Sequence, residues 1–170
     1  MTSLTARPGA ADLQSPFDVV AQRVPAQRRT KRQLLSASRA LERRALAAGV
    51  DTVLVTFQDR RHLTPPTRDA YAGLARSGAT VHAFARGLVS DYRPGSTGLS
   101  HVALLPHDPL ALEWDLVVLG RTFSAAFVAR DLTPGATADG ADLDRPFSWT
   151  QTEDPDLVSA CADRLLARLP

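Results

Sequence analysis

The sequence predicts a single α/β (α+β) domain with a mixed, mostly antiparallel sheet of about six strands, one parallel crossover, and N-terminal and C-terminal helices packed on it. Three observations support this fold. Helical periods alternate with short apolar runs in the first half of the chain, the later apolar runs lie close together, and an amphipathic segment ends the sequence. The length of 170 residues suits one domain.

The first part of the chain contains the signals for a short helix, a long helix and a strand. Ser15 is an N-cap followed by Pro16 at the first helical position, which starts the short helix. Thr30 caps the long helix, and Gly49 ends it as a C′ residue. The apolar β-branched run 53–57 follows directly and suits a buried strand. The inward face of the long helix comprises Leu34, Leu35, Ser38, Leu41, Ala45 and Leu46.

A helix and a second buried strand come next. Pro65 and Pro66 are expected to delay the helix until Thr67, and Gly78 stops it. The apolar run 81–85 is expected to form a strand parallel to the first, because the order strand, helix, strand usually gives a right-handed crossover.

The remaining elements follow a different pattern. Four apolar runs lie too close together for crossover helices, so their strands are expected to be antiparallel. Residues 131–145 contain Pro134, two glycines and four aspartates and are expected to form an exposed loop. A final helix begins after the Asp154 cap, with Pro155 at its first position. The four runs are 102–105, 116–119, 123–129 and 147–150.

The expected domain covers residues 15–170 and follows a flexible tail at residues 1–14, which lacks a hydrophobic period. No apolar run approaches the roughly 20 residues that span a bilayer, and no secretory signal starts the chain. The single cysteine, Cys161, excludes an internal disulfide and is expected to be an inert buried thiol. These features predict a cytoplasmic protein with no membrane partner.

The positive charge is concentrated on the long helix and the segment before it. The formal net charge is +2, and eight of the 20 basic residues lie between positions 23 and 44. Only one of the 20 is a lysine, which points to codon bias, and residues 25–49 contain no aromatic residue that could stack on a base. A nucleic-acid partner is therefore not expected, whereas binding of an acidic protein stays open.

The segment 108–115 is the first candidate site. Asp108, Glu113 and Asp115 surround Trp114 just before a buried strand. These carboxylates could form the rim of a pocket for a polar ligand, with Trp114 stacking on it. The structural alternative is that Asp108 caps a turn, Glu113 pairs with an arginine and Trp114 belongs to the core. In an enzyme, the same carboxylates would be the acid and the base.

A second candidate site lies at the end of the first strand, where open α/β sheets tend to bind ligands. Gln58, Arg68 and Tyr71 could converge there; the alternative is that Gln58 ties down a loop and Tyr71 fills the core. Arg145, just before the last strand, is expected to form a buried ion pair with Glu113. The candidate ligand-binding residues are therefore Gln58, Arg68, Tyr71, Asp108, Glu113, Trp114 and Arg145.

No motif for a metal, a nucleotide or a catalytic nucleophile is found in the sequence. The four histidines lack the spacing of a zinc site, and the aspartates of 139–144 lack the terminal glutamate of a calcium loop. Ser96 does not lie in a Gly-x-Ser-x-Gly elbow, and no glycine-rich phosphate loop occurs. We therefore expect no catalytic residue, metal or cofactor, and only an unidentified small molecule as ligand.

A set of short motifs follows one order along nearly the whole chain. They are Phe57-Gln58, Thr64 with Arg68, Tyr71 and Leu74, Asp108-Pro109-Leu110, Glu113-Trp114, Val117-Val118, Asp131-Leu132, and Arg145 with Phe147. In this order and spacing the chain resembles the DICT family, named as the sensory domain of diguanylate cyclases and two-component systems. The likeness spans about residues 15–169.

The resemblance implies a non-catalytic bacterial signal-sensing module that binds a small molecule or another cue. Such domains are often fused to signalling output domains, but no cyclase, kinase or DNA-binding segment is recognised here. The signal is therefore expected to pass to a separate output protein or through self-association. The alternative is a protein–protein interaction adaptor without a small-molecule ligand, which would meet its partner through the basic helix or the loop 86–99.

Overall fold

The computed structural model describes residues 14–135 and 142–170. The short 3-10 turns in these ranges are η2 (Arg60–His62), η3 (Pro109–Leu112) and η4 (Asp142–Asp144). The helices and strands in chain order are α1 (Pro16–Ala21), β1 (Gln27–Thr30), α2 (Lys31–Ala48), β2 (Thr52–Asp59), α3 (Pro65–Arg76), β3 (Thr80–Arg86), β4 (Leu99–Ala103), β5 (Glu113–Leu119), β6 (Ala125–Asp131), β7 (Pro146–Thr152) and α4 (Pro155–Leu166).

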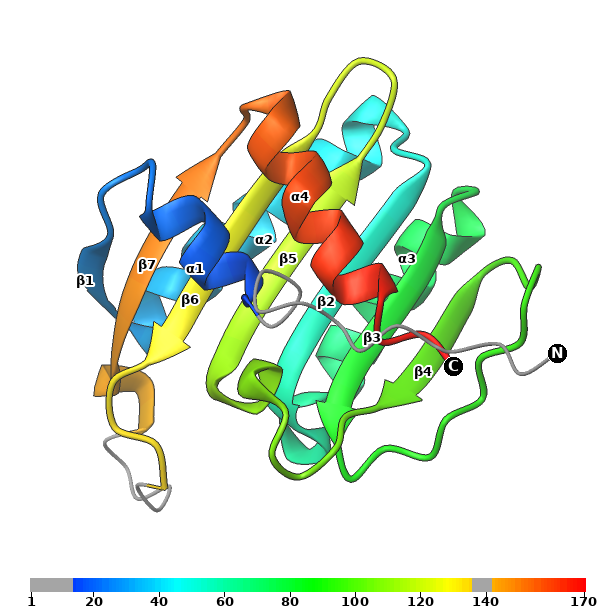
Figure 1. Cartoon of the computed structure of the whole chain (residues 1–170). Helices are drawn as coiled ribbons and strands as arrows, with labels where there is room; N and C mark the ends of the chain where they lie inside the picture. Colours follow the sequence, from blue (N-terminus) through cyan, green and yellow to red (C-terminus); the bar gives the residue numbers. More distant parts are fainter. Residues whose placement is uncertain (1–13, 136–141) are drawn as a thin grey trace, which may run out of the picture.

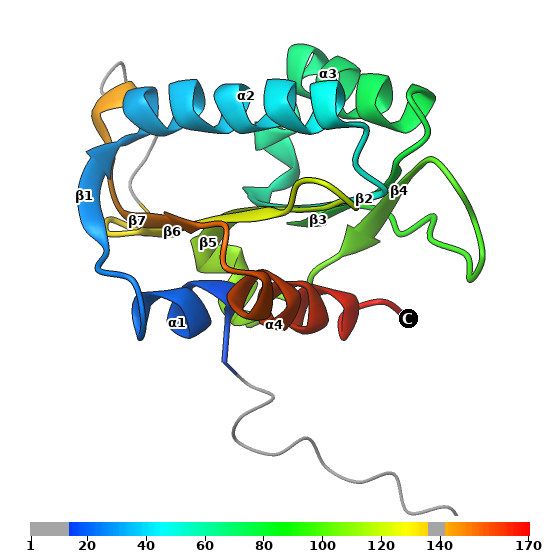
Figure 2. The ribbon, with the colours of Figure 1, turned by 90° about the horizontal axis from the view of Figure 1, so that it is seen from above.

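The described strands form one seven-stranded sheet in the order β1-β7-β6-β5-β2-β3-β4. Helices α1 and α4 cover one face of this sheet, and α2 and α3 cover the other (Figure 1, Figure 2). The mixed α/β class and the mostly antiparallel pairing are confirmed, with seven strands in place of about six. The predicted parallel pairing of the strands at 53–57 and 81–85 is also confirmed, as β2 and β3.

The predicted direction of the strand at 102–105 is wrong. This strand, β4, starts at Leu99 and runs parallel to β3, with Val81 opposite Leu99. The segment 87–98 supplies the length that the chain needs to return along the sheet without a helix. The sheet therefore contains two parallel pairings, β2 with β3 and β3 with β4, where one was expected.

The additional strand is β1, at the opposite edge of the sheet. It pairs antiparallel with β7, from Gln27 opposite Trp149 to Thr30 opposite Pro146. Its sequence Gln-Arg-Arg-Thr has no apolar alternation, so the pattern of the sequence does not indicate a strand. Short charged edge strands of this kind also discourage pairing with another chain.

The helix ends agree with the capping signals. Ser15 and Thr30 each form a capping box at the start of α1 and α2, and Asp154 accepts hydrogen bonds from two backbone amides at the start of α4. Gly49 ends α2 in the left-handed conformation with φ of 61°. Helix α3 begins at Pro65 and not at Thr67, because the first turn of a helix does not use its own N–H groups and accepts proline.

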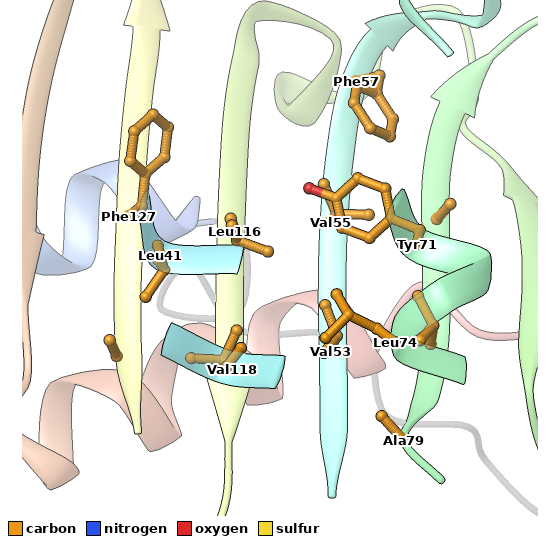
Figure 3. Close-up of a cluster of buried hydrophobic side chains, with 14 of the residues drawn as sticks. Leu41, Val53, Val55, Phe57, Tyr71, Leu74, Ala79, Leu116, Val118 and Phe127 are labelled. Atoms are coloured by element: carbon orange, nitrogen blue, oxygen red, sulfur yellow. The ribbon is translucent and has the colours of Figure 1, made fainter. Parts of the chain in front are cut away.

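Buried side chains lie on both faces of the sheet because successive strand residues point to opposite sides. In β5, Leu116 and Val118 face α2 and α3, whereas Val117 packs against the layer of α1 and α4. Figure 3 shows the α2 and α3 side, where Tyr71 and Leu74 of α3 lie over side chains of β2.

The segment expected to be an exposed loop at 131–145 has buried ends. Asp131 is the last residue of β6, and both Asp131 and Arg145 are buried. Residues 136–141 lie outside the described ranges, as do residues 1–13 of the predicted tail. None of the helices in the described ranges is long and apolar enough to cross a membrane.

Candidate functional site

A cavity of about 480 Å³ lies where α2 and the start of α3 meet the carboxyl end of β2. Its size is within the usual range for small-molecule sites. The position is the one expected for a ligand in an open α/β sheet. It is lined by Lys31, Leu35, Ser38, Arg39, Glu42, Phe57, Gln58, His62, Thr64, Pro66, Thr67, Ala70, Tyr71, Trp114, Leu143 and Phe147.

Aromatic rings make up much of the cavity wall. Phe57, Trp114 and Phe147 come from β2, β5 and β7 and belong to the core layer under α2 and α3. The Phe57 and Tyr71 rings meet edge to face at 5.9 Å, and those of Trp114 and Phe147 meet in the same way at 6.2 Å. These contacts hold the rings in place, so the apolar wall is largely built before any ligand arrives.

Glu42 of α2 is an acceptor in the cavity wall. The hydroxyl of Tyr71 donates a hydrogen bond to Glu42 Oε1 over 2.9 Å. Burial raises the pKa of Glu42, while this hydrogen bond and the charges of Arg39 and Arg43 act in the opposite direction. Burial, followed by the Glu42 carboxylate, raises the pKa of Tyr71 well above its usual value. Tyr71 therefore keeps its proton and stays a donor to Glu42.

His62 of η2 provides an uncharged polar group in the same wall. Burial, followed by the charges of Lys31, Arg61 and Arg145, lowers the pKa of His62 to about 4. The imidazole is therefore neutral at pH 7, with one nitrogen as a donor and the other as an acceptor.

A network of polar side chains fixes Gln58 at the end of β2. Gln58 Nε2 donates to Asp131 Oδ2 over 2.8 Å, and Arg145 donates to Asp131, to Asp142 over 3.1 Å and to Gln58 Oε1 over 3.5 Å. Lys31 forms an ion pair with Asp142. The network ties the start of α2 and the segment before β7 to β2, so this side of the cavity is held rigid.

The structure brings together three of the residues proposed as a site from the sequence. Gln58, Tyr71 and Trp114 all line the cavity, and Arg145 supports Gln58 from outside the lining. Arg68 is exposed on α3 and is not part of the lining.

The other two candidates lie away from the cavity. Asp108 caps η3 and pairs with Arg168 over 3.2 Å, as the structural alternative for this residue supposed. Glu113 is fully buried on the sheet face that α1 covers, where it accepts a hydrogen bond from the Phe17 amide over 3.3 Å.

The predicted ion pair between Glu113 and Arg145 is wrong. Glu113 pairs with Arg130 over 2.9 Å, and Arg145 pairs with Asp131. Glu113 and Arg130 are direct neighbours across β5 and β6, so the strand register places them together. Arg145 lies over the ring of Phe147, on the face that packs under α2 and α3.

Asp115 and Cys161 accompany Glu113 in the layer of α1 and α4. Burial raises the pKa of Asp115 well above its usual value, and the charge of Glu113 raises it further. Neither carboxyl oxygen of Asp115 has a hydrogen-bond partner among the described residues. Burial also raises the pKa of the Cys161 thiol to about 12. The Cys161 thiol is therefore protonated at neutral pH, and burial favours the protonated form of Asp115.

Several lining residues were not found from the sequence, above all Glu42, His62, Lys31 and Phe147. One signal for Glu42 was available. It follows Ser38, a member of the buried stripe of α2, by four positions, so it lies on the same side of the helix, next to that stripe. Polar residues next to an apolar stripe can indicate a cavity, but no such signal marks His62 in its short turn.

Within the described ranges, no group of three or more His, Cys, Asp or Glu side chains is arranged to hold a metal ion. The lining offers aromatic contact from Phe57, Trp114 and Phe147, and hydrogen-bonding groups from Glu42 and His62.

Comparisons with known proteins give one family match. No curated protein matches the chain significantly. Among solved structures, polyphosphate kinase from Porphyromonas gingivalis is similar, with 17% sequence identity and a TM-score of 0.49. The similarity covers 79% of this chain and 22% of the kinase, so the chain spans less than a quarter of its length. It is too weak to support a functional conclusion.

The family match covers residues 14–132, from just before α1 to just after β6. It ends before β7 and α4, whereas the likeness found in the sequence extends through both. It covers Gln58, Tyr71 and Trp114 of the cavity and spans well over half of the chain. This chain therefore belongs to the DICT family, the sensory domain in diguanylate cyclases and two-component systems.

Proposed function

We propose that this chain is a non-catalytic signal-sensing module that binds a small molecule in the cavity between α2, α3 and β2 and passes the signal to a separate output protein. The observation that carries the proposal is the cavity itself, with its aromatic wall and its few fixed polar groups. This combination is typical of small-molecule sites. A sensory family supplies a reason for such a site.

The placement of the carboxylates supports a binding role over a catalytic one. Asp108 is held by Arg168, and Glu113 and Asp115 are both fully buried on the opposite face of the sheet from the cavity. An acid and base pair must reach its substrate, and none of these three residues lines the cavity. Among the described residues, Glu42 is the one carboxylate of the lining.

Helix α2 is the element that would carry the signal to the surface. Its inner side contributes Leu35, Ser38 and Glu42 to the cavity, while Arg43 and Arg44 are exposed on the same helix. A ligand that contacts the inner side can therefore shift the position or stability of a strongly cationic outer surface. An acidic surface on the output protein would complement this charge.

Native mass spectrometry of the protein purified from its own host tests the proposal. We expect a fraction of the chains to carry a bound small molecule, which the added mass identifies. The variant Ala70→Trp places a large ring on a lining residue and should remove the added mass. Asp69→Trp changes the neighbouring exposed residue of α3, which is not in the lining, and should retain it.

Two outcomes contradict the proposal. An added mass that survives in Ala70→Trp would place the ligand outside the cavity. A bare chain that copurifies with one protein in stoichiometric amount, in both variants, would favour the interaction adaptor.

A further inference from the structure

We propose that the cavity selects an uncharged aromatic molecule that presents an N–H or O–H donor to Glu42. The inference rests on the proposed function and names the chemical class of the signal. Three features of the cavity carry it: its rings, its balance of charge and the free accepting capacity of one carboxylate.

The rings favour an aromatic ligand. Two pairs of rings line the cavity: Trp114 of β5 contacts Phe147 of β7, and Phe57 of β2 contacts Tyr71 of α3. Aromatic surfaces gain by offset and edge-to-face contact with a further ring beyond what burial alone provides. An aliphatic ligand of the same size would gain only the free energy of burying its apolar surface.

The charges of the lining favour a neutral ligand because both signs occur in it. Lys31 is paired with Asp142, and the positive charge of Arg39 acts on Glu42, whose pKa it lowers. His62 is uncharged at neutral pH. A charged ligand of either sign would lose hydration and approach a like charge, an anion the Glu42 carboxylate and a cation Lys31 and Arg39.

Glu42 selects for a donor on the ligand. A carboxylate accepts several hydrogen bonds, and within the described part of the chain Tyr71 supplies one side-chain donor, to Oε1. No cation among the described residues forms a salt bridge with Glu42, although its side chain lies in the cavity wall. The hydrogen bond from Tyr71 uses Oε1, so the other oxygen of the carboxylate can accept a donor of the ligand.

Three fluorescent dyes of one skeleton separate these features. N-Phenyl-1-naphthylamine is uncharged and has one N–H donor, its N-methyl derivative has no donor, and 8-anilinonaphthalene-1-sulfonate has the donor and a negative charge. In fluorescence titrations of the whole chain at neutral pH, we expect the amine to bind about tenfold more tightly than either of the others. Ala70→Trp should abolish the binding of the amine, and Asp69→Trp should not.

Two substitutions of Glu42 test the role of the carboxylate. Glu42→Leu should weaken the amine about tenfold, to the level of the N-methyl dye, whose own affinity stays unchanged. Glu42→Gln keeps an oxygen acceptor for Tyr71 and removes the charge, so it should strengthen the sulfonate dye and change the amine by less than about threefold. If Glu42→Leu does not fold, the gain of the sulfonate dye in Glu42→Gln decides the question.

The outcomes distinguish an error in the chemical class of the ligand from an error in the proposed binding function of the cavity. If the sulfonate or the N-methyl dye binds as tightly as the amine and Ala70→Trp blocks it, the cavity is a binding site and the chemical class is wrong. If none of the dyes binds the wild-type chain, or Ala70→Trp leaves their binding unchanged, the proposed cavity function is overturned as well.

Discussion

The guanidinium of Arg130 on β6 lies 2.9 Å from the fully buried carboxylate of Glu113 on β5. The same guanidinium nitrogen also reaches Asp18 and Ser15 of the α1 region, at 2.9 and 3.0 Å. Because Glu113 in addition accepts the Phe17 amide, the pair joins the sheet to the first helix of the domain. Glu113 is therefore a structural residue that holds α1 in place.

Replacing Glu113 should destabilise the fold substantially. Glu113→Ala leaves the Phe17 amide without its acceptor and removes one of the two carboxylates that Arg130 contacts. Arg130 keeps Asp18 and is 34% exposed, so water offsets part of its loss. We expect a decrease of about 2–4 kcal/mol in the free energy of unfolding, measured by urea denaturation. Glu153→Ala, which breaks the exposed pair with Arg44, is the control and should cost less than about 1 kcal/mol. Equal losses in the two variants would contradict a stabilising role for Glu113.

Asp115 should make the stability of the protein depend on pH. Its pKa is raised in the folded state, so the folded state binds the proton more tightly than the unfolded state does. This stabilisation is lost progressively as pH increases above the pKa of the unfolded state, about 3.9. The variant Asp115→Asn cannot ionise at this position, so it does not lose this stabilisation as pH increases. The free energy of unfolding of Asp115→Asn relative to wild type should therefore rise between pH 5 and pH 8. The same difference for Asp69→Asn, on the surface of α3, should stay flat. A constant difference for Asp115→Asn would show that Asp115 is already ionised in the fold.

Cys161 should be almost unreactive in the native protein. The thiol is fully buried in α4, and burial raises its pKa to about 12, so very little thiolate exists at neutral pH. We expect Ellman's reagent to react about a thousandfold more slowly with the native chain than with the chain in denaturant. A cysteine introduced by Ser159→Cys, at an exposed position of the same helix, should react rapidly. Rapid reaction of Cys161 itself would mean that α4 opens from the sheet.

The helix ends were predictable from sequence because their signals are local. Ser15, Thr30, Gly49 and Asp154 each act on amides or carbonyls within a few residues, and the structure shows each of them at the end of its helix. The direction of β4 was not predictable in this way, because a loop of the length of 87–98 permits either direction and the choice depends on the partner strand.

The candidate site was partly predictable from the sequence. Gln58 and Tyr71 could be placed near the carboxyl end of β2 from the order of the elements alone. The partner of Glu113 could not be predicted from the order of the elements. Arg130 lies on the neighbouring strand β6 and Arg145 just before β7, and the strand register decides which of them meets Glu113. The contact between Glu42 and Tyr71 depends on how α2 packs against α3, which the periodicity of α2 does not report.

Tyr71→Phe should weaken the fold in a pH-dependent manner that reports on Glu42. The hydroxyl of Tyr71 stabilises the ionised form of Glu42 and lowers its pKa against the larger effect of burial. Its contribution is therefore present when Glu42 is ionised and is lost as falling pH protonates that carboxyl.

We expect Tyr71→Phe to cost about 1–2 kcal/mol at pH 8 and clearly less at pH 5, measured by urea denaturation at both values. Tyr92→Phe is the matched control, since no hydrogen bond of the Tyr92 hydroxyl occurs among the described residues, and its small effect should not change with pH. A cost for Tyr71→Phe that is the same at both values would mean that Glu42 does not change its charge between them. The acceptor proposed for the ligand would then hold one charge state across this range, and binding of the naphthylamine dye should be equally insensitive to pH.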